Sequence, residues 1–223
     1  NPAHAGRGLR LLRRKGVETV TGVLRGPCDE LVAPFRTWIL RARPHVTLKL
    51  AMTLDGRIAD ARGQSKWITG PAARSHVQAL RRRADVIMVG AGTARADDPS
   101  LLPRPARGRK PWRVVVSSTG RLPSSLKVLN DAAAERTVVT CRRDVVDTHP
   151  ESRGGGPGPG ELLPLRGAGD GVSLKHLFRV LAKRGFMHVL CEGGGSLAGQ
   201  LVRAGLVDQF VFFIAPSLLG GPG

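Results

Sequence analysis

The chain has 223 residues and is 41% hydrophobic, so it can bury the core of one large domain, or of one domain and part of another. Its formal net charge is +18, yet it contains only six Phe, three Trp and no Tyr. So few aromatic side chains argue against a surface that stacks on nucleic-acid bases, and an anionic small-molecule substrate explains the charge better. No apolar run reaches the roughly 18 residues that a membrane span needs.

The cysteine and histidine content argues against a metal site. Cys28, Cys141 and Cys191 are odd in number and far apart, which fits neither a disulfide framework nor a zinc site, and the histidines are isolated. The zinc-deaminase signature of HxE and CxxC is absent, as are GxxxxGK[ST], GxSxG and HExxH. We therefore expect no metal and no deaminase activity. The basic N-terminus lacks an apolar signal core, which favours a cytoplasmic location.

The first 43 residues are expected to form a separate unit. The pattern predicts a basic helix at 8–15, a strand at 17–20 and a helix at 28–40 with apolar residues at helical spacing. Arg43-Pro44 breaks this pattern, so we place a boundary between residues 1–43 and residues 44–223. Asn1 is not an initiator Met, which indicates a fragment or a processed chain.

Strands alternate with helices after the boundary, which predicts an α/β domain with a largely parallel sheet. The glycine- and proline-rich segment 152–160 predicts a flexible surface loop. Strands are expected at 46–52, 86–89, 113–117, 137–140, 189–191 and 209–215, and helices at 71–83, 174–183 and 196–204.

Polar or glycine-rich loops are expected after three of these strands: GAGTARADDP, SSTGRLP and EGGGS. Ligands of parallel sheets bind beyond the carboxyl ends of the strands. EGGGS also opens a helix, whose free N–H groups would suit a phosphate. The alternative is a tight turn in which the glycines serve packing. Glu192 argues against this alternative, because a carboxylate at the end of a strand is costly unless it binds something. GAGTARADDP has a similar alternative, a turn in which Asp97 or Asp98 acts as a cap.

Single residues outside these loops also allow two interpretations. Trp67 has polar neighbours, Ser65 among them, so it is expected to line a rim or stack on a planar ring, unless it is a core residue. Lys49 lies in an apolar strand, where it either meets an anionic group or faces outward from an edge strand. Arg81 either binds an anionic substrate or belongs to an exposed arginine run.

Five segments, in this order, resemble the reductase domain of the bifunctional riboflavin-biosynthesis deaminase-reductase: KLAMTLDGRIA, SKWIT, ADVIMVGAGT, ADDPSLLPR and LCEGGGSLAGQL. The resemblance implies a dihydrofolate-reductase-like fold with a mixed, mostly parallel sheet flanked by helices. It also implies NADPH-dependent reduction of the ribosyl group of 5-amino-6-(5-phosphoribosylamino)uracil to a ribityl chain. The segment before residue 44 resembles the end of the partner deaminase domain, without its zinc-binding part, and the family's C-terminal end is also expected to be missing.

The resemblance further implies the roles of individual residues. Glu192, Lys49 and Asp55 become candidate catalytic residues, and Arg142-Arg143 are candidate partners of the cofactor's 2′-phosphate unless they form a solvated turn. Positions matching nucleotide contacts are Met52, Trp67, Thr93, Asp97, Ser118, Gly194, Gly195, Ser196, Leu197, Ala198, Gly199 and Gln200. Positions matching substrate contacts are Ser65, Arg81, Leu101, Arg104 and Glu192.

The expected partner is thus a phosphorylated pyrimidine, with no nucleic acid or membrane, and the expected assembly is a homo-oligomer, either dimer or tetramer. Two other functions stay open at this point. One is a related pterin- or folate-type reductase on the same fold. The other is a basic module that binds nucleic acid or protein without turnover.

Overall fold

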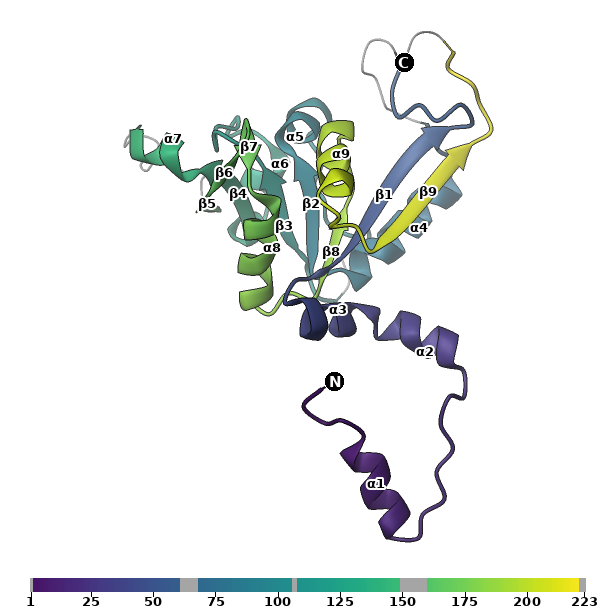
Figure 1. The fold of residues 1–223 in the computed structure, drawn as a ribbon. Coiled ribbons are helices and arrows are strands. Elements are labelled where there is room, and N and C mark those ends of the chain that lie inside the picture. Colours follow the sequence, from purple (N-terminus) through teal and green to yellow (C-terminus); the bar gives the residue numbers. More distant parts are fainter. Residues whose placement is uncertain (1, 61–67, 106–107, 149–159, 221–223) are drawn as a thin grey trace.

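A seven-stranded sheet forms the centre of the computed structural model, which describes residues 2–60, 68–105, 108–148 and 160–220 (Figure 1). The strand order is β5-β4-β3-β2-β8-β1-β9, and every neighbouring pair is parallel. The predicted parallel α/β architecture is therefore confirmed. The strands are β1 (His45–Thr53), β2 (Val86–Gly90), β3 (Trp112–Val116), β4 (Thr137–Arg142), β5 (Glu161–Leu165), β8 (His188–Cys191) and β9 (Gln209–Ala215).

Helices cover both faces of this sheet and so create two separate cores. One core packs the sheet against α8 (Leu174–Lys183) and α9 (Gly195–Arg203), and the other packs it against α4 (Pro71–Arg83), α5 (Ala91–Asp97) and α6 (Lys127–Asn130). Strand β2 shows why both form. Val86 and Met88 enter the first core, whereas Ile87 and Val89 enter the second, because successive side chains of a strand point to opposite faces.

The position of β8 in the sheet decides where a ligand can bind. This late strand lies between β1 and β2, so the chain crosses back into the middle of the sheet after building β3, β4 and β5. The loops that leave β2 and β8 therefore emerge side by side, although about 100 residues separate them in the sequence. Such a change in strand order opens a crevice at the carboxyl edge.

The N-terminal segment differs from the sequence prediction in two ways. The helix expected at 8–15 is present as α1 (Arg7–Arg14), but no strand forms at 17–20, where the chain has no neighbouring strand to pair with. The single helix expected at 28–40 is two helices, α2 (Arg25–Leu31) and α3 (Ala33–Arg41). Pro34 explains the break, because proline in a helix interior has no N–H to donate and its ring clashes with the preceding turn.

Other differences lie in short elements. Residues of GAGTARADDP, expected as a loop, form helix α5, and Asp98 accepts a hydrogen bond of 2.7 Å from the backbone N–H of Lys127 at the start of α6. The glycine-rich loop expected at 152–160 lies outside the described residues except for Gly160. Elements that were not expected are β5, α6, η1 (Ala134–Arg136), α7 (Arg143–Thr148) and the small antiparallel pair β6 (Gly167–Ala168) and β7 (Gly171–Val172). Among the described residues, no helix has the length and apolar character to span a bilayer.

Candidate active site

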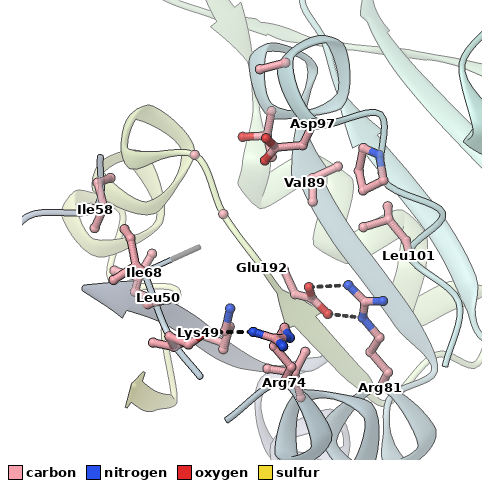
Figure 2. A pocket seen from close by; sticks show the side chains of 18 of the residues that line it. Lys49, Leu50, Ile58, Ile68, Arg74, Arg81, Val89, Asp97, Leu101 and Glu192 are labelled. Atoms are coloured by element: carbon pink, nitrogen blue, oxygen red, sulfur yellow. Dashed lines mark hydrogen bonds and ion pairs between the residues drawn. The ribbon is translucent and has the colours of Figure 1, made fainter. Parts of the chain in front are cut away.

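A cleft of about 810 Å³ opens at the carboxyl edge of the sheet, where β1, β2 and β8 lie next to one another (Figure 2). Its size falls within the range of roughly 300–1,000 Å³ that is usual for small-molecule sites. The cleft lies between α4 on one side and the first turns of α5 and α9 on the other. Nine residues that the sequence had singled out line it: Lys49, Arg81, Thr93, Asp97, Leu101, Arg104, Glu192, Gly194 and Gly195.

The first turn of α9 provides an anion-binding surface. The first hydrogen bond within this helix is donated by the Ala198 N–H to the Gly194 carbonyl oxygen at 2.9 Å. The N–H groups of the preceding turn therefore lack partners within the helix. Because the helix dipole also places partial positive charge there, this turn suits a phosphate group. Leu197 and Ala198 are almost completely buried in the sheet core, so only backbone groups of this part of the run can reach a ligand.

Gly194 and Gly195 lie in close contact with neighbouring side chains, and the requirement for glycine is stronger at Gly194. A Cβ atom on Gly194 would lie 2.8 Å from the Thr93 hydroxyl oxygen, and one on Gly195 would lie 2.9 Å from the Ile58 side chain. Gly194 also has φ of +84°, a left-handed conformation that favours glycine. Packing therefore explains the glycines at 194 and 195 of EGGGS. Because both glycines also line the cleft, the N-terminus of α9 stays accessible to a ligand.

Helix α5 brings a second N-terminus to the same edge. Gly92 and Thr93 of its first turn line the cleft, and Asp97 lines it from the last turn. The Thr93 hydroxyl faces Gly194, so the turns after β2 and β8 meet directly. Two helix N-termini that converge on one cavity favour a ligand with linked phosphates.

Glu192 and Arg81 form the central charged pair of the cleft. Arg81 donates from Nε to Glu192 Oε1 at 2.5 Å and from Nη2 to Oε2 at 2.7 Å, as Figure 2 shows. The exposed fractions of the two side chains are 14% and 8%. Although only glycines and a serine follow Glu192 in the sequence, α4 brings Arg81 to it from the far side of the cleft. Arg81 is likewise no part of a solvated arginine run.

Lys49 contributes a cation that carries no ion pair within the described part of the chain. Strand β1 lies between β8 and β9 rather than at an edge, so Lys49 points into the cleft and not to bulk solvent. Its ammonium lies 5.6 Å from the centre of the Phe213 ring. Burial lowers the pKa of Lys49 from its usual 10.5, and the Glu192 carboxylate offsets part of this shift.

Helix α4 presents further cleft residues that the sequence analysis did not single out, and two of them, Arg74 and Gln78, have long polar side chains. They precede Arg81 by seven and three residues, so all three lie on one face of the helix. Arg74 donates to the Thr69 carbonyl oxygen at 3.0 Å. The repeat of polar residues every third or fourth position was the signal that could have identified them.

The segment from Leu101 to Arg104 forms the rim opposite β1. Leu101 is 1% exposed and has φ of +58°, and its side chain closes the floor of the cleft. Arg104 is exposed, and its guanidinium makes no hydrogen bond or ion pair with the residues that the structure describes. Among the described residues it is thus an unpaired cation that lines the cleft.

Other predicted site residues lie elsewhere. Asp55 does not line the cleft; it accepts hydrogen bonds from the Thr53 hydroxyl at 2.5 Å and from the Gly220 N–H at 3.0 Å, which lower its pKa to about 2. Ser65 and Trp67 lie outside the described residues. Predicted cofactor positions that do not line the cleft are Met52, Ser118, Ser196, Leu197, Ala198, Gly199 and Gln200.

The Arg142-Arg143 pair after β4 is divided between two environments. Arg142 is held by Asp144 at 2.5 Å and by the Gly169 carbonyl oxygen at 2.9 Å, whereas Arg143 is exposed. Arg143 is therefore the freer of the two cations. As for metals, no group of three or more His, Cys, Asp or Glu side chains within the described segments is placed to hold an ion.

Comparison with known proteins gives consistent results. The model of the RibD C-terminal domain matches residues 44–223. The riboflavin biosynthesis protein RibD of Actinobacillus pleuropneumoniae is 38% identical over 221 residues, which is 99% of this chain and 58% of that protein. This chain thus spans less than two thirds of the curated relatives it matches.

Solved structures agree with the sequence comparison. Acinetobacter baumannii RibD superposes with a TM-score of 0.76 at 31% identity, over 97% of this chain and 58% of the other. A diaminohydroxyphosphoribosylaminopyrimidine deaminase/5-amino-6-(5-phosphoribosylamino)uracil reductase from Thermotoga maritima superposes with a TM-score of 0.79, also at 31% identity, over 96% and 56%. The α/β sheet, the cleft and these matches together show that the chain belongs to the RibD C-terminal domain family.

Proposed function

We propose that this chain is an NADPH-dependent reductase that converts the ribosyl group of 5-amino-6-(5-phosphoribosylamino)uracil to a ribityl chain in riboflavin biosynthesis. The observation that supports the proposal is that the two walls of one cleft differ in the chemical groups that they present. The wall of α5 and α9 offers glycines and the backbone N–H groups of two helix N-termini, and the wall of β1 and α4 offers partly buried charged side chains. The first suits a dinucleotide and the second suits a polar, phosphorylated substrate.

Residues of the first wall fit NADPH. The free N–H groups at the start of α9 and the neighbouring α5 turn would bind its diphosphate, and Gly194 leaves the approach open. The cofactor supplies a hydride when bound. Arg143, at the carboxyl end of β4, is the cation that supports a preference for NADPH over NADH, because Arg142 is already paired with Asp144.

The charged wall fits the substrate chemistry. Opening of the aminoribose ring breaks the bond between C1′ and the ring oxygen, which takes up a proton, and leaves a positively charged imine. A hydride added to the imine carbon turns it into the CH2 group of the ribityl chain, and the nitrogen becomes a neutral amine. The Glu192 carboxylate, fixed by Arg81, stabilises that developing cation. Lys49 is the proton donor for the ring oxygen, because it lies in the same cleft and its lowered pKa makes proton release easier.

We assign the substrate phosphate to Arg104 rather than to Arg81. The guanidinium nitrogens of Arg81 bond Glu192 and the Leu102 carbonyl oxygen, so its planar fork is occupied. Arg104 has its fork free at the mouth of the cleft. Arg81 then serves the substrate indirectly, by holding Glu192.

Two expectations about the larger protein remain proposals. Residues 1–43 would be the end of a preceding deaminase-like domain, which is supported by the start of the family match at residue 44 and by exposed apolar side chains such as Leu11 and Leu31. A cytoplasmic homo-oligomer remains our expectation for the assembled enzyme.

The test is NADPH oxidation by the purified chain in the presence of 5-amino-6-(5-phosphoribosylamino)uracil, followed by the loss of NADPH absorbance. We expect saturable turnover, with NADH a weaker cofactor. Turnover of dihydrofolate or a pterin instead would move the assignment to another reductase on this fold. Tight binding of nucleic acid without any NADPH oxidation would contradict an enzymatic role.

A further inference from the structure

Helix α4 is connected to the 101–104 segment by three side-chain hydrogen bonds, of which two are short. Gln78 Oε1 accepts from the backbone N–H of Arg104 at 2.8 Å, and Arg81 Nη1 donates to the Leu102 carbonyl oxygen at 3.1 Å. Both bonds end on backbone atoms. They therefore fix the path of this segment rather than the side chains that it carries.

The backbone conformation of this segment is energetically unfavourable at Leu101. Leu101 has φ of +58°, a left-handed conformation that is unfavourable for a residue with a branched side chain. Such conformations cost about 1–3 kcal/mol and persist only where the surroundings hold them. Leu101 is held by burial of its side chain, and the end of the segment by Gln78.

The position of the Arg104 guanidinium depends on the backbone conformation, because no described residue bonds the side chain itself. Its side chain is exposed and makes no hydrogen bond or ion pair among the described residues, whereas its backbone N–H is bonded to Gln78. The direction in which the side chain leaves the backbone is therefore set by the backbone alone. Arg82 Nη1 reaches the Arg104 carbonyl oxygen only at 3.4 Å, which is too long to replace Gln78.

We propose that Gln78 is a positioning residue for phosphate recognition: by holding the backbone of Arg104, it directs the free guanidinium toward the phosphate of the substrate. This inference rests on the proposed function and deepens it. Gln78 also lines the cleft itself. Direct contact with the pyrimidine or the ribose is therefore the competing role, and the experiment separates the two.

The experiment compares two substrates in one protein. Gln78→Met keeps the length of the side chain and removes the acceptor, and kcat and KM are measured for 5-amino-6-(5-phosphoribosylamino)uracil and for its dephosphorylated form. Loss of one neutral hydrogen bond predicts a rise in KM of about three- to tenfold for the phosphorylated substrate. The kcat for it and the kcat/KM for the dephosphorylated form should stay close to those of the unsubstituted chain.

A double-mutant cycle with Arg104→Ala identifies the route of the effect. If Gln78 acts through Arg104, then Gln78→Met should add almost nothing once Arg104→Ala is present. Equal losses on both substrates, no loss on either, or full additivity in the cycle would each overturn the inference. Failure of the unsubstituted chain to reduce either substrate would instead overturn the proposed function, so the two failures are distinguishable.

Discussion

The two walls of the cleft offer ligands different kinds of groups. The wall formed by α5 and α9 uses backbone N–H groups and glycines, so its geometry follows from the sheet and its helices. The wall formed by β1, α4 and the 101–104 segment uses long charged side chains that must be held by one another, as Arg81 holds Glu192. We infer that substitutions that add volume impair the wall of α5 and α9 more than substitutions that change charge. For the wall of β1, α4 and the 101–104 segment, we expect loss of charge to be the more harmful change.

The largest effect is expected from Glu192→Gln on the charged wall. Loss of the carboxylate removes the stabilisation of the developing cation and leaves the buried Arg81 without its counterion, so kcat should fall by at least about 100-fold. The free energy of unfolding should also fall, by up to about 3 kcal/mol, because one partner of a buried pair is removed. Steady-state kinetics and thermal unfolding measure the two effects.

Glu161→Gln provides the matched control. Glu161 forms a similar two-bond pair with Arg184, at 2.5 and 2.7 Å, but the pair is more exposed and does not line the cleft. Its loss should leave kcat unchanged and cost little stability. If Glu192→Gln is no worse than Glu161→Gln, then Glu192 has no role in turnover.

Arg104→Ala is expected to have the next largest effect, and to act on KM. A charge-assisted hydrogen bond contributes about 1.5–3 kcal/mol, which predicts a KM about 10- to 150-fold higher for the phosphorylated substrate. The kcat should be spared if the phosphate is bound equally in ground and transition states. Arg83→Ala, which removes the same charge from the exposed end of α4, is the control, and an equal rise in KM for both would indicate general electrostatic attraction.

Gly194→Ala tests the wall formed by α5 and α9. The new Cβ would meet the Thr93 hydroxyl at 2.8 Å, so the turn should shift and NADPH affinity should fall about tenfold, because binding of the diphosphate depends on the position of the turn. Gly185→Ala is the control: its φ of +82° imposes similar strain, yet a Cβ there meets nothing within 4 Å. Fluorescence titration with NADPH should show weaker binding only for Gly194→Ala.

The lowered pKa of Lys49 predicts that kcat and stability depend on pH in the alkaline range. Burial lowers its pKa below 10.5, so a proton donor at this position should lose activity as pH rises through that lowered value. The lowered pKa also means that the folded state binds this proton less tightly, so stability should rise with pH in the interval from the lowered pKa up to 10.5. In Lys49→Arg the alkaline limb of the kcat profile should move beyond the accessible pH range, and an unchanged limb would assign it to another group.

The smallest effect on catalysis is expected from Asp55→Asn, although the sequence placed Asp55 among the catalytic candidates. Its carboxylate joins the Thr53 turn to the segment after β9, and its pKa of about 2 reflects those hydrogen bonds. The stabilisation is present above the ordinary pKa of 3.8 and is lost as pH falls toward 2. Thermal unfolding should therefore show a small loss near neutral pH that vanishes in acid, while kcat and KM stay unchanged.

The sequence alone determined the main strands and the parallel sheet, because apolar runs such as 86–89 and the alternation of strands with helices are local patterns. It also identified nine residues that line the cleft, Glu192 and Arg81 among them, since loops at the carboxyl ends of parallel strands share one edge. It failed at 17–20, where a strand-like run has no partner, and at Pro34, where one proline outweighed the helical spacing of its neighbours.

Only the tertiary structure decided which charges remain available. The sequence gives Arg81 and Arg104 the same side chain, but the insertion of β8 beside β2 brings Glu192 to Arg81 and leaves Arg104 free at the rim. The hydrogen bonds of Gln78 and Asp55 likewise join residues that are far apart in the chain, such as Asp55 and Gly220. Hydrogen bonds and ion pairs depend on distances of a few tenths of an ångström, and those distances are set by packing that no local pattern in the sequence encodes.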